Sequence, residues 1–164
     1  MLPARLVFHR PPAGAALCRS GGEMTAWIYQ MAEDEEWTPE DYRLSVWEGQ
    51  QVTWRYGKVV SRGGPELGAG DQVIFFFAKS RTRLPGICGW GVVIKVYARK
   101  GEMTFRPVFP SDLLKMSPIW DNEIEHVINE VRGPNPRGTM WSVRDDSFQT
   151  ICRRILEYRG AART

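Results

Sequence analysis

Apolar residues recur with a period of two along the first two thirds of the chain, and this pattern predicts short β-strands. Aromatic and β-branched residues, which favour strands, are concentrated in the segments 26–31, 51–56, 72–78, 87–98 and 103–109. Phe75, Phe76 and Phe77 follow one another in the third segment, so alternate rings are expected to enter the core on opposite faces of one strand. Glycine-rich residues at 57–70 predict a loop, and residues 99–102 predict a turn.

Other segments show helical signals instead. After Asp121, apolar residues fall at i, i+3, i+4 and i+7 on one helical face; they are Ile124, Val127, Ile128 and Val131. A second apolar stripe runs over residues 148–158, and Ser142-x-x-Asp145 before it predicts a capping box. Thr38 as N-cap and Pro39 in the first turn predict a short helix over 39–44.

These elements predict an α+β fold, because short strands of irregular spacing are interrupted by helices and followed by a final one. The regular strand–helix alternation of a parallel sheet is absent from the pattern. A strongly curved β-barrel of five or six strands, with inserted helices and a C-terminal helix, fits best. Residues 25–160 are expected to form one domain. Residues 1–24 have no strand or helix period, and we expect a disordered leader or an early start, with Met24 as the initiator.

Composition adds less than the pattern does. The formal charge is +3, but the three arginines and one glutamate of residues 1–23 supply most of it. Only the local distribution of charge can therefore argue for nucleic acid. The three cysteines are far apart and there are two histidines, so neither a metal site nor a disulfide framework is expected. A reducing, cytoplasmic location and no membrane span are expected.

Basic and aromatic residues are interleaved in three loop regions. Such a combination suits nucleic acid, because aromatic rings stack on bases and cations contact phosphates. The regions are Trp54, Arg55, Tyr56 and Lys58; Lys79, Ser80, Arg81, Thr82 and Arg83; and Arg132, Arg137 and Trp141.

The order of several motifs resembles the EVE domain of the PUA-like superfamily, which also includes YTH and ASCH domains. The motifs are AWIYQ, TWRYGKV, GAGDQVIFFFAKS, GICGWGVVIKV, FRPVFPSDLL and GTMWSVRDDSFQTI, which together run from about residue 26 to 155. The resemblance implies a PUA-like barrel whose pocket accepts one nucleobase flipped out of its strand. Trp54 matches a family tryptophan before the pocket, and residues 77–80 match the end of the central strand. Ala78-Lys79 replaces the family's aromatic–histidine pair there.

Together, the residues and the resemblance predict a module that binds DNA or RNA carrying a modified cytosine or adenine, in a restriction or RNA-modification context. A separately encoded nuclease is a possible partner. No cofactor and no catalytic residue is expected. The expected base-pocket residues are Trp54, Tyr56, Phe77, Lys79, Ser80, Trp27, Trp90 and Trp141, with core packing as the alternative for the tryptophans. The expected phosphate contacts are Arg55, Lys58, Arg81, Arg83 and Arg137.

Two other functions stay open. An enzyme acting on a nucleotide or nucleic acid could in principle use Lys79, Ser80 and Asp71. The dipeptide Gly70-Asp71 also predicts a turn, which is the alternative role of Asp71. A protein-interaction domain could instead use exposed tryptophans on a partner.

Overall fold

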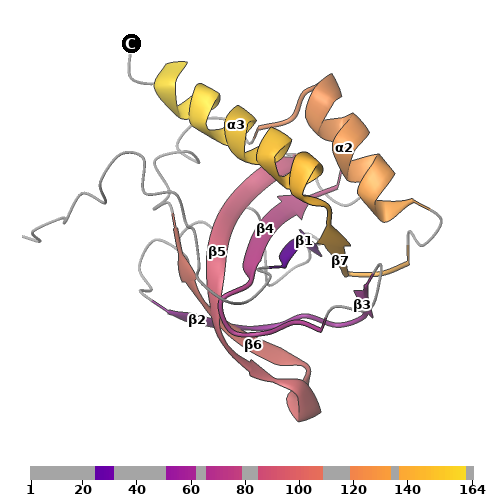
Figure 1. Cartoon of the computed structure of the whole chain (residues 1–164), viewed down its shortest axis with the longest axis vertical. Coiled ribbons are helices and arrows are strands. Elements are labelled where there is room, and N and C mark those ends of the chain that lie inside the picture. The colour runs from indigo at the N-terminus through magenta and orange to yellow at the C-terminus, as the bar shows by residue number, and fades with distance from the viewer. Residues whose placement is uncertain are drawn as a thin grey trace, which may run out of the picture.

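A computed structural model describes residues 25–31, 51–61, 66–78, 85–108, 119–133 and 137–161 (Figure 1). These residues form a mixed α+β fold with one sheet, two α-helices and one 3-10 turn. The strands are β1 (Ala26–Met31), β2 (Val52–Arg55), β3 (Val59–Val60), β4 (Gln72–Phe77), β5 (Gly86–Tyr97), β6 (Glu102–Pro107) and β7 (Met140–Val143). The helices are α2 (Asn122–Arg132) and α3 (Asp145–Ala161), and the 3-10 turn is η1 (Ala98–Lys100).

The sheet has seven strands in the order β2-β6-β5-β4-β1-β7-β3. The pairs β1–β4 and β3–β7 are parallel, and the other four are antiparallel. One prediction is corrected here: the described residues form seven strands rather than five or six, because β3 and β7 were not foreseen. Within these residues the strand pairing leaves β2 and β3 as edges, so backbone hydrogen bonds do not close the sheet into a barrel.

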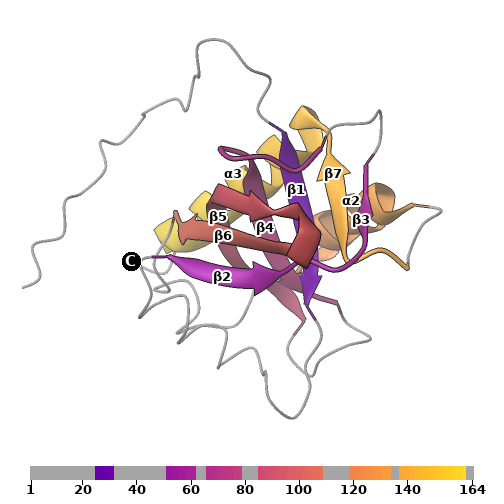
Figure 2. The same ribbon diagram turned by 90° about the horizontal axis from the view of Figure 1, so that it is seen from below.

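The two edge strands are nevertheless joined by only three residues, 56–58. Four Cα steps span at most about 14 Å, so the sheet must curl until its edges approach within that distance at this crossing. Thr139 holds the crossing: its Oγ1 lies 2.7 Å from the Tyr56 carbonyl and 3.0 Å from the Lys58 carbonyl. The Thr139 backbone N–H also donates to the Lys58 carbonyl, at 2.9 Å. Figure 2 shows the resulting curl from below.

Curling divides the core into two clusters. The inner cluster fills the concave side of the sheet and contains Trp27, Tyr29, Met31, Tyr56, Val73, Phe75, Phe77, Val93, Met103, Phe105 and Met140. The outer cluster lies between the sheet and the two helices and includes Phe76 and Trp141. Every residue of β4 is buried, because Phe75 and Phe77 face inward while Phe76 faces the helices. The predicted alternation of the three phenylalanines is confirmed.

The helix predicted after Asp121 is confirmed as α2. The Asp121 carboxylate accepts the Ile124 backbone N–H at 2.9 Å, as an N-cap does, and the four predicted apolar residues are buried. The C-terminal helix is also confirmed, but its capping box is wrong. Ser142 lies inside β7 and α3 starts only at Asp145, so Ser142 cannot be the cap of this helix.

The helices cover only part of the sheet. They pack on β1, β4, β7 and the first half of β5, whereas β2, β6 and the second half of β5 form a separate arm in the lower half of Figure 1. On β6 the alternation is plain: Met103 and Phe105 enter the inner cluster, while Glu102, Thr104 and Arg106 point the opposite way. No described helix covers this outer side.

Several predictions fall outside the described residues. They are the helix at 39–44, the leader at 1–24 and the basic loop with Lys79, Ser80, Arg81 and Arg83. Of the helices in the described part of the chain, none is both long enough and apolar enough to span a bilayer.

Candidate nucleic-acid interface

Trp54 lies on the edge strand β2, half-buried against the inner cluster. Its indole N–H donates to the Tyr29 hydroxyl at 3.2 Å, and that hydroxyl donates to the Arg55 carbonyl at 2.7 Å. Burial raises the pKa of the Tyr29 phenol, and the Trp54 N–H lowers it by less. The phenol therefore stays protonated at neutral pH and fixes the plane of the Trp54 ring through a defined donor–acceptor chain.

The cations next to Trp54 do not share its face. Arg55 points to the outer side of the sheet, where its Nε lies 3.5 Å from a Glu102 carboxylate oxygen and its side chain is 86% exposed. Tyr56 turns back and is buried in the inner cluster, and Lys58 is exposed on the crossing. A strand's two-residue period separates neighbouring side chains in this way. The Trp54 ring and the exposed cations Arg55 and Lys58 thus lie around one edge of the sheet, on different faces.

Three of the expected pocket residues have no exposed face. Trp27 and Phe77 are fully buried in the inner cluster, and Trp141 is fully buried in the outer one. The Arg132 guanidinium lies 5.7 Å from the Trp141 ring centroid. In this arrangement a base cannot reach these three rings, which are part of the core. For Trp27 and Trp141, core packing is the alternative given in the sequence analysis.

Trp90 is partly buried on the helix side. Its indole N–H donates to the Gln72 side-chain carbonyl at 2.8 Å, and its ring meets Phe148 edge-on with centroids 5.6 Å apart. Trp90 and Trp141 thus belong to the outer cluster, whereas Trp54 and Tyr56 belong to the inner one. The sheet lies between the two pairs, so one pocket cannot contain both.

The structure therefore brings together Trp54, Tyr29, Tyr56, Arg55 and Lys58 around the edge of β2. Lys79, Ser80, Arg81 and Arg83 lie outside the described residues. Arg137 is exposed just before Thr139, which binds the crossing.

Asp71 has a structural role that the sequence only hinted at. Its carboxylate is buried and accepts three N–H groups: the Trp27 indole at 2.9 Å, the Gly68 backbone at 2.9 Å and the Thr25 backbone at 3.2 Å. These bonds tie the turn before β4 to β1. The turn interpretation of Gly70-Asp71 agrees with this network.

A cleft of about 200 Å³ lies on the helix side of the sheet. It is lined by Thr25, Glu130, Val131, Ser142, Val143, Arg144 and Ser147. None of the residues predicted for the base pocket or the phosphate contacts lines it. Within the described ranges, no group of three or more His, Cys, Asp and Glu side chains is placed to hold a metal ion.

Sequence reasoning missed a set of exposed cations at the end of β5, on η1 and on β6. They are Lys95, Arg99, Lys100 and Arg106, next to the half-buried Tyr97. The sequence does contain a pattern that predicts them. Polar Lys95 is followed by apolar Val96, and apolar Phe105 by polar Arg106, which is typical of a strand with one face exposed to solvent.

Comparison with known proteins gives the fold and no function. No model of a protein family matches the chain, and no curated protein matches it. A solved structure of a protein from Leishmania major, described as hypothetical, is similar with a TM-score of 0.55 and 13% identity, covering 84% of this chain and 98% of that one. A protein from Pseudomonas putida gives a TM-score of 0.43 and 11% identity over 79% and 99% of the two chains. The first likeness extends over nearly the whole of that protein and concerns the fold alone; the second is too low to support an argument.

Proposed function

We propose that the protein is a nucleic-acid-binding module with a PUA-like barrel, in which one flipped, modified base stacks on Trp54. The observation that carries the proposal is the half-buried indole at the sheet edge, oriented by Tyr29, with Arg55 and Lys58 exposed at the same edge of the sheet. The barrel is supported by the three-residue crossing between the two edge strands.

Stacking is the main energetic term of this proposal. A base on an aromatic plate contributes about 1–3 kcal/mol, which offsets the few kcal/mol needed to extrude a base from a duplex. A single-stranded site avoids most of that cost. The inner cluster behind Trp54 is packed by its own rings, with Phe75 and Phe105 centroids 4.6 Å apart. We therefore place the base against the outer part of the Trp54 ring, at the rim of the curl and not inside it.

Selectivity for a modification would come from the walls around the stacked base. One methyl group in an apolar setting is worth about 1–3 kcal/mol. A reader of this kind suits a restriction or RNA-modification context, in which a separately encoded nuclease or other enzyme would do the chemistry. This chain would supply recognition alone.

The proposal is tested by fluorescence anisotropy with labelled single-stranded DNA and RNA 12-mers. Each would carry cytosine, 5-methylcytosine, adenine or N6-methyladenine at its centre. We expect one modified oligonucleotide to bind at least about tenfold more tightly than its unmodified partner. Trp54→Ala should weaken that binding by about 5- to 150-fold, and Trp54→Phe, which keeps a ring, should weaken it less.

The matched control is Trp120→Ala, because Trp120 is also half-buried but packs on the outer cluster. It should leave binding unchanged, with thermal denaturation confirming that each variant is folded. Equal binding of all oligonucleotides by wild type and Trp54→Ala would refute the base-stacking site. Absence of binding to the whole panel would refute the nucleic-acid function itself.

A further inference from the structure

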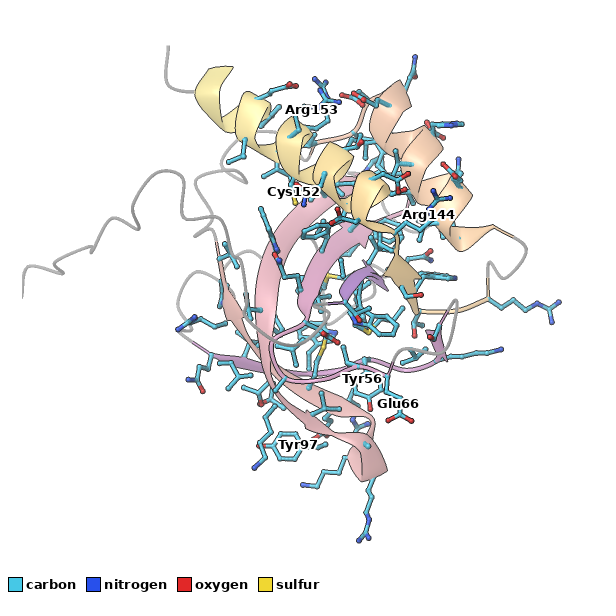
Figure 3. All side chains as sticks on the ribbon, viewed as in Figure 1. Tyr56, Glu66, Tyr97, Arg144, Cys152 and Arg153 are labelled. Carbon is cyan, nitrogen blue, oxygen red and sulfur yellow. The ribbon has the colours of Figure 1, made fainter. Side chains whose placement is uncertain are left out.

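The arm opposite the helices presents a continuous polar surface, which we call the basic hairpin face. It consists of the outward residues of β2, β6 and the end of β5, together with the η1 tip: Thr53, Arg55, Lys95, Tyr97, Arg99, Lys100, Glu102, Thr104 and Arg106. Figure 3 labels Tyr97 on this arm, at the far end of the molecule from Arg144 and Arg153 on the helix side.

Strand register arranges this face in rows. Lys95 pairs with Thr104, which pairs with Thr53, and the two threonine hydroxyls lie 2.9 Å apart. The next row joins Tyr97, Glu102 and Arg55. These rows lie on the side of the strands opposite to Met103 and Phe105, which are fully buried. The outer residues are therefore not needed to fill the core.

The charge of the face is strongly one-sided. It carries five cations, namely Arg55, Lys95, Arg99, Lys100 and Arg106, and one carboxylate, Glu102, whereas the whole chain has a formal charge of +3. Among the described residues, Glu102 is the carboxylate that pairs with a cation of this face, through Arg55.

The arginines of α3 are arranged differently. Arg153 pairs with Glu123 and Glu157, and Arg154 pairs with Asp121, Glu123 and Glu157. Positive charge on the helix side is thus matched by fixed carboxylates, and on the basic hairpin face it is largely unmatched. Unmatched cations gathered on one face attract polyanions.

An aromatic ring lies among these cations. The Lys95 ammonium is 4.9 Å from the centroid of the Tyr97 ring, and the Lys100 ammonium is 6.0 Å from it. Tyr97 is half-buried, so part of its ring faces solvent. When a phosphate binds the ammonium group of either lysine, that group can move away from the Tyr97 ring. The exposed face of the ring is then available for a base to stack on.

We propose that the basic hairpin face binds the backbone of a single nucleic-acid strand, independently of sequence, with Tyr97 stacking on one base. This inference rests on the proposed nucleic-acid function and adds a second contact surface to it. From Arg106 to Glu102 the face is about 13 Å long, which accommodates at most about four nucleotides, given the ~3.4 Å rise per nucleotide of a fully stacked strand. Arg55 belongs to this face and also neighbours Trp54, so a strand crossing the face reaches the edge of β2.

An anionic membrane is the main competitor for a basic face. Stable membrane docking usually adds apolar side chains that enter the lipid. In the described part of the chain the exposed large apolar residues are Ile94 and Leu156, and Leu156 lies on α3. The face therefore has one such side chain nearby, and its threonine row and tyrosine suit a nucleic-acid strand better.

The test compares two double variants that remove the same charge. Arg99→Gln/Lys100→Gln changes the tip of the face, and Arg144→Gln/Arg153→Gln changes the helix side, where both side chains are more than half exposed. Binding of labelled dT12 and rU12 is measured by anisotropy between 50 and 200 mM salt. Loss of two phosphate contacts should lower the slope of log affinity against log salt by about 1.4. Affinity should fall by about 60-fold at 50 mM and about tenfold at 200 mM.

The control variant should keep the wild-type slope, and the tip variant should keep the wild-type ratio of modified to unmodified binding. Trp54→Ala should lose the preference for the modified oligonucleotide and keep the wild-type slope of log affinity against log salt. Equal slopes for the tip and control variants would overturn the basic hairpin face while leaving Trp54 untouched. Failure of the wild type to bind any oligonucleotide would overturn both proposals. Tighter binding to phosphatidylserine-containing vesicles than to dT12 or rU12, lost in the tip variant, would overturn the inference in favour of a membrane.

Discussion

The indole N–H of Trp27 donates a 2.9 Å hydrogen bond to Oδ2 of Asp71, and both side chains are almost completely buried. The partners lie 44 residues apart in the chain, on β1 and at the start of β4. Because the same carboxylate also accepts the Gly68 and Thr25 backbone N–H groups, one side chain fixes the start of the central parallel strand pair.

Asp71→Ala should be strongly destabilising. It leaves the buried Trp27 N–H and two backbone N–H groups without their acceptor, and each hydrogen bond to a charged group contributes about 1.5–3 kcal/mol. We expect the free energy of unfolding in urea to fall by roughly 3 kcal/mol or more. Asp71→Asn keeps one acceptor oxygen and should lose less. A change below about 0.5 kcal/mol for Asp71→Ala would show that this network does not stabilise the fold.

The crossing between the edge strands gives a second prediction. Gly57 has a φ of +59°, and a Cβ built on it would lie 2.7 Å from Thr139 Oγ1. Gly57→Ala therefore adds both backbone strain and a steric clash. It should also displace the hydroxyl that binds the Tyr56 and Lys58 carbonyls. We expect a loss of about 2–3 kcal/mol in the free energy of unfolding.

Gly101→Ala separates the two causes. Gly101 has nearly the same φ, +64°, but nothing lies within 4 Å of a Cβ built there. This variant should show the backbone strain alone, about 1 kcal/mol. If thermal and urea denaturation gave equal losses for the two variants, Thr139 would not restrain the crossing.

Most strands and both described helices could be predicted because they depend on local patterns. The strands predicted at 26–31, 72–78 and 103–109 correspond to β1, β4 and β6, and burial on both faces of β4 follows from three successive phenylalanines. The strands β3 and β7 were missed for a physical reason: they have two and four residues, and they form through pairing with distant parts of the sheet. The curl of the sheet likewise depends on the distant contact between Thr139 and the crossing.

The candidate site was harder to predict than the fold. Sequence places Trp54 and Arg55 side by side, but strand geometry sends them to opposite faces. It also groups Trp54 with Trp90 and Trp141, which the sheet separates. The face of each tryptophan depends on its register, and β4–β5 pairing shifts between Phe75 and Phe76. Such a shift is invisible without the partner strand.

Cys152 should be an unreactive thiol in the folded protein. Burial, with a smaller effect of the Asp145 carboxylate, raises its pKa from 9.0 to about 12. In a Cys18→Ser/Cys88→Ser background, iodoacetamide at pH 8.5 should modify Cys152 at least about 100-fold more slowly than in guanidinium, because the thiolate is the reacting species. Because the thiol has a higher pKa in the folded state than in the unfolded state, keeping it protonated favours the fold. This contribution to the free energy of unfolding is fully present below pH 9 and is lost as the pH rises from 9 towards 12. Equally fast modification with and without guanidinium would contradict the buried, protonated thiol.

The N-cap of α2 predicts a specific response to acid. The Ile124 backbone N–H, followed by the Arg154 guanidinium, holds the pKa of the Asp121 carboxyl below its ordinary 3.8. A carboxylate with a lowered pKa stabilises the fold above about pH 3.8, and that contribution is lost as the pH falls through the pKa of the folded state. Asparagine is also a good N-cap, so Asp121→Asn should keep the bond to Ile124 and lose only the charge.

We therefore expect Asp121→Asn to unfold more easily than wild type at pH 7, with the difference shrinking between pH 4 and pH 2. The measurement is urea denaturation across that range. The control variant is Glu125→Gln, which also removes one negative charge from the start of the same helix. The bond to the Ile124 N–H and the ion pair with Arg154 are made by Asp121, so this variant leaves both in place. Its curve should run parallel to that of the wild type. If the Asp121→Asn and wild-type curves stayed equally far apart down to pH 2, the ion pair with Arg154 would not be the source of the acid sensitivity. The helix pair would then be held by its buried apolar face, which does not titrate.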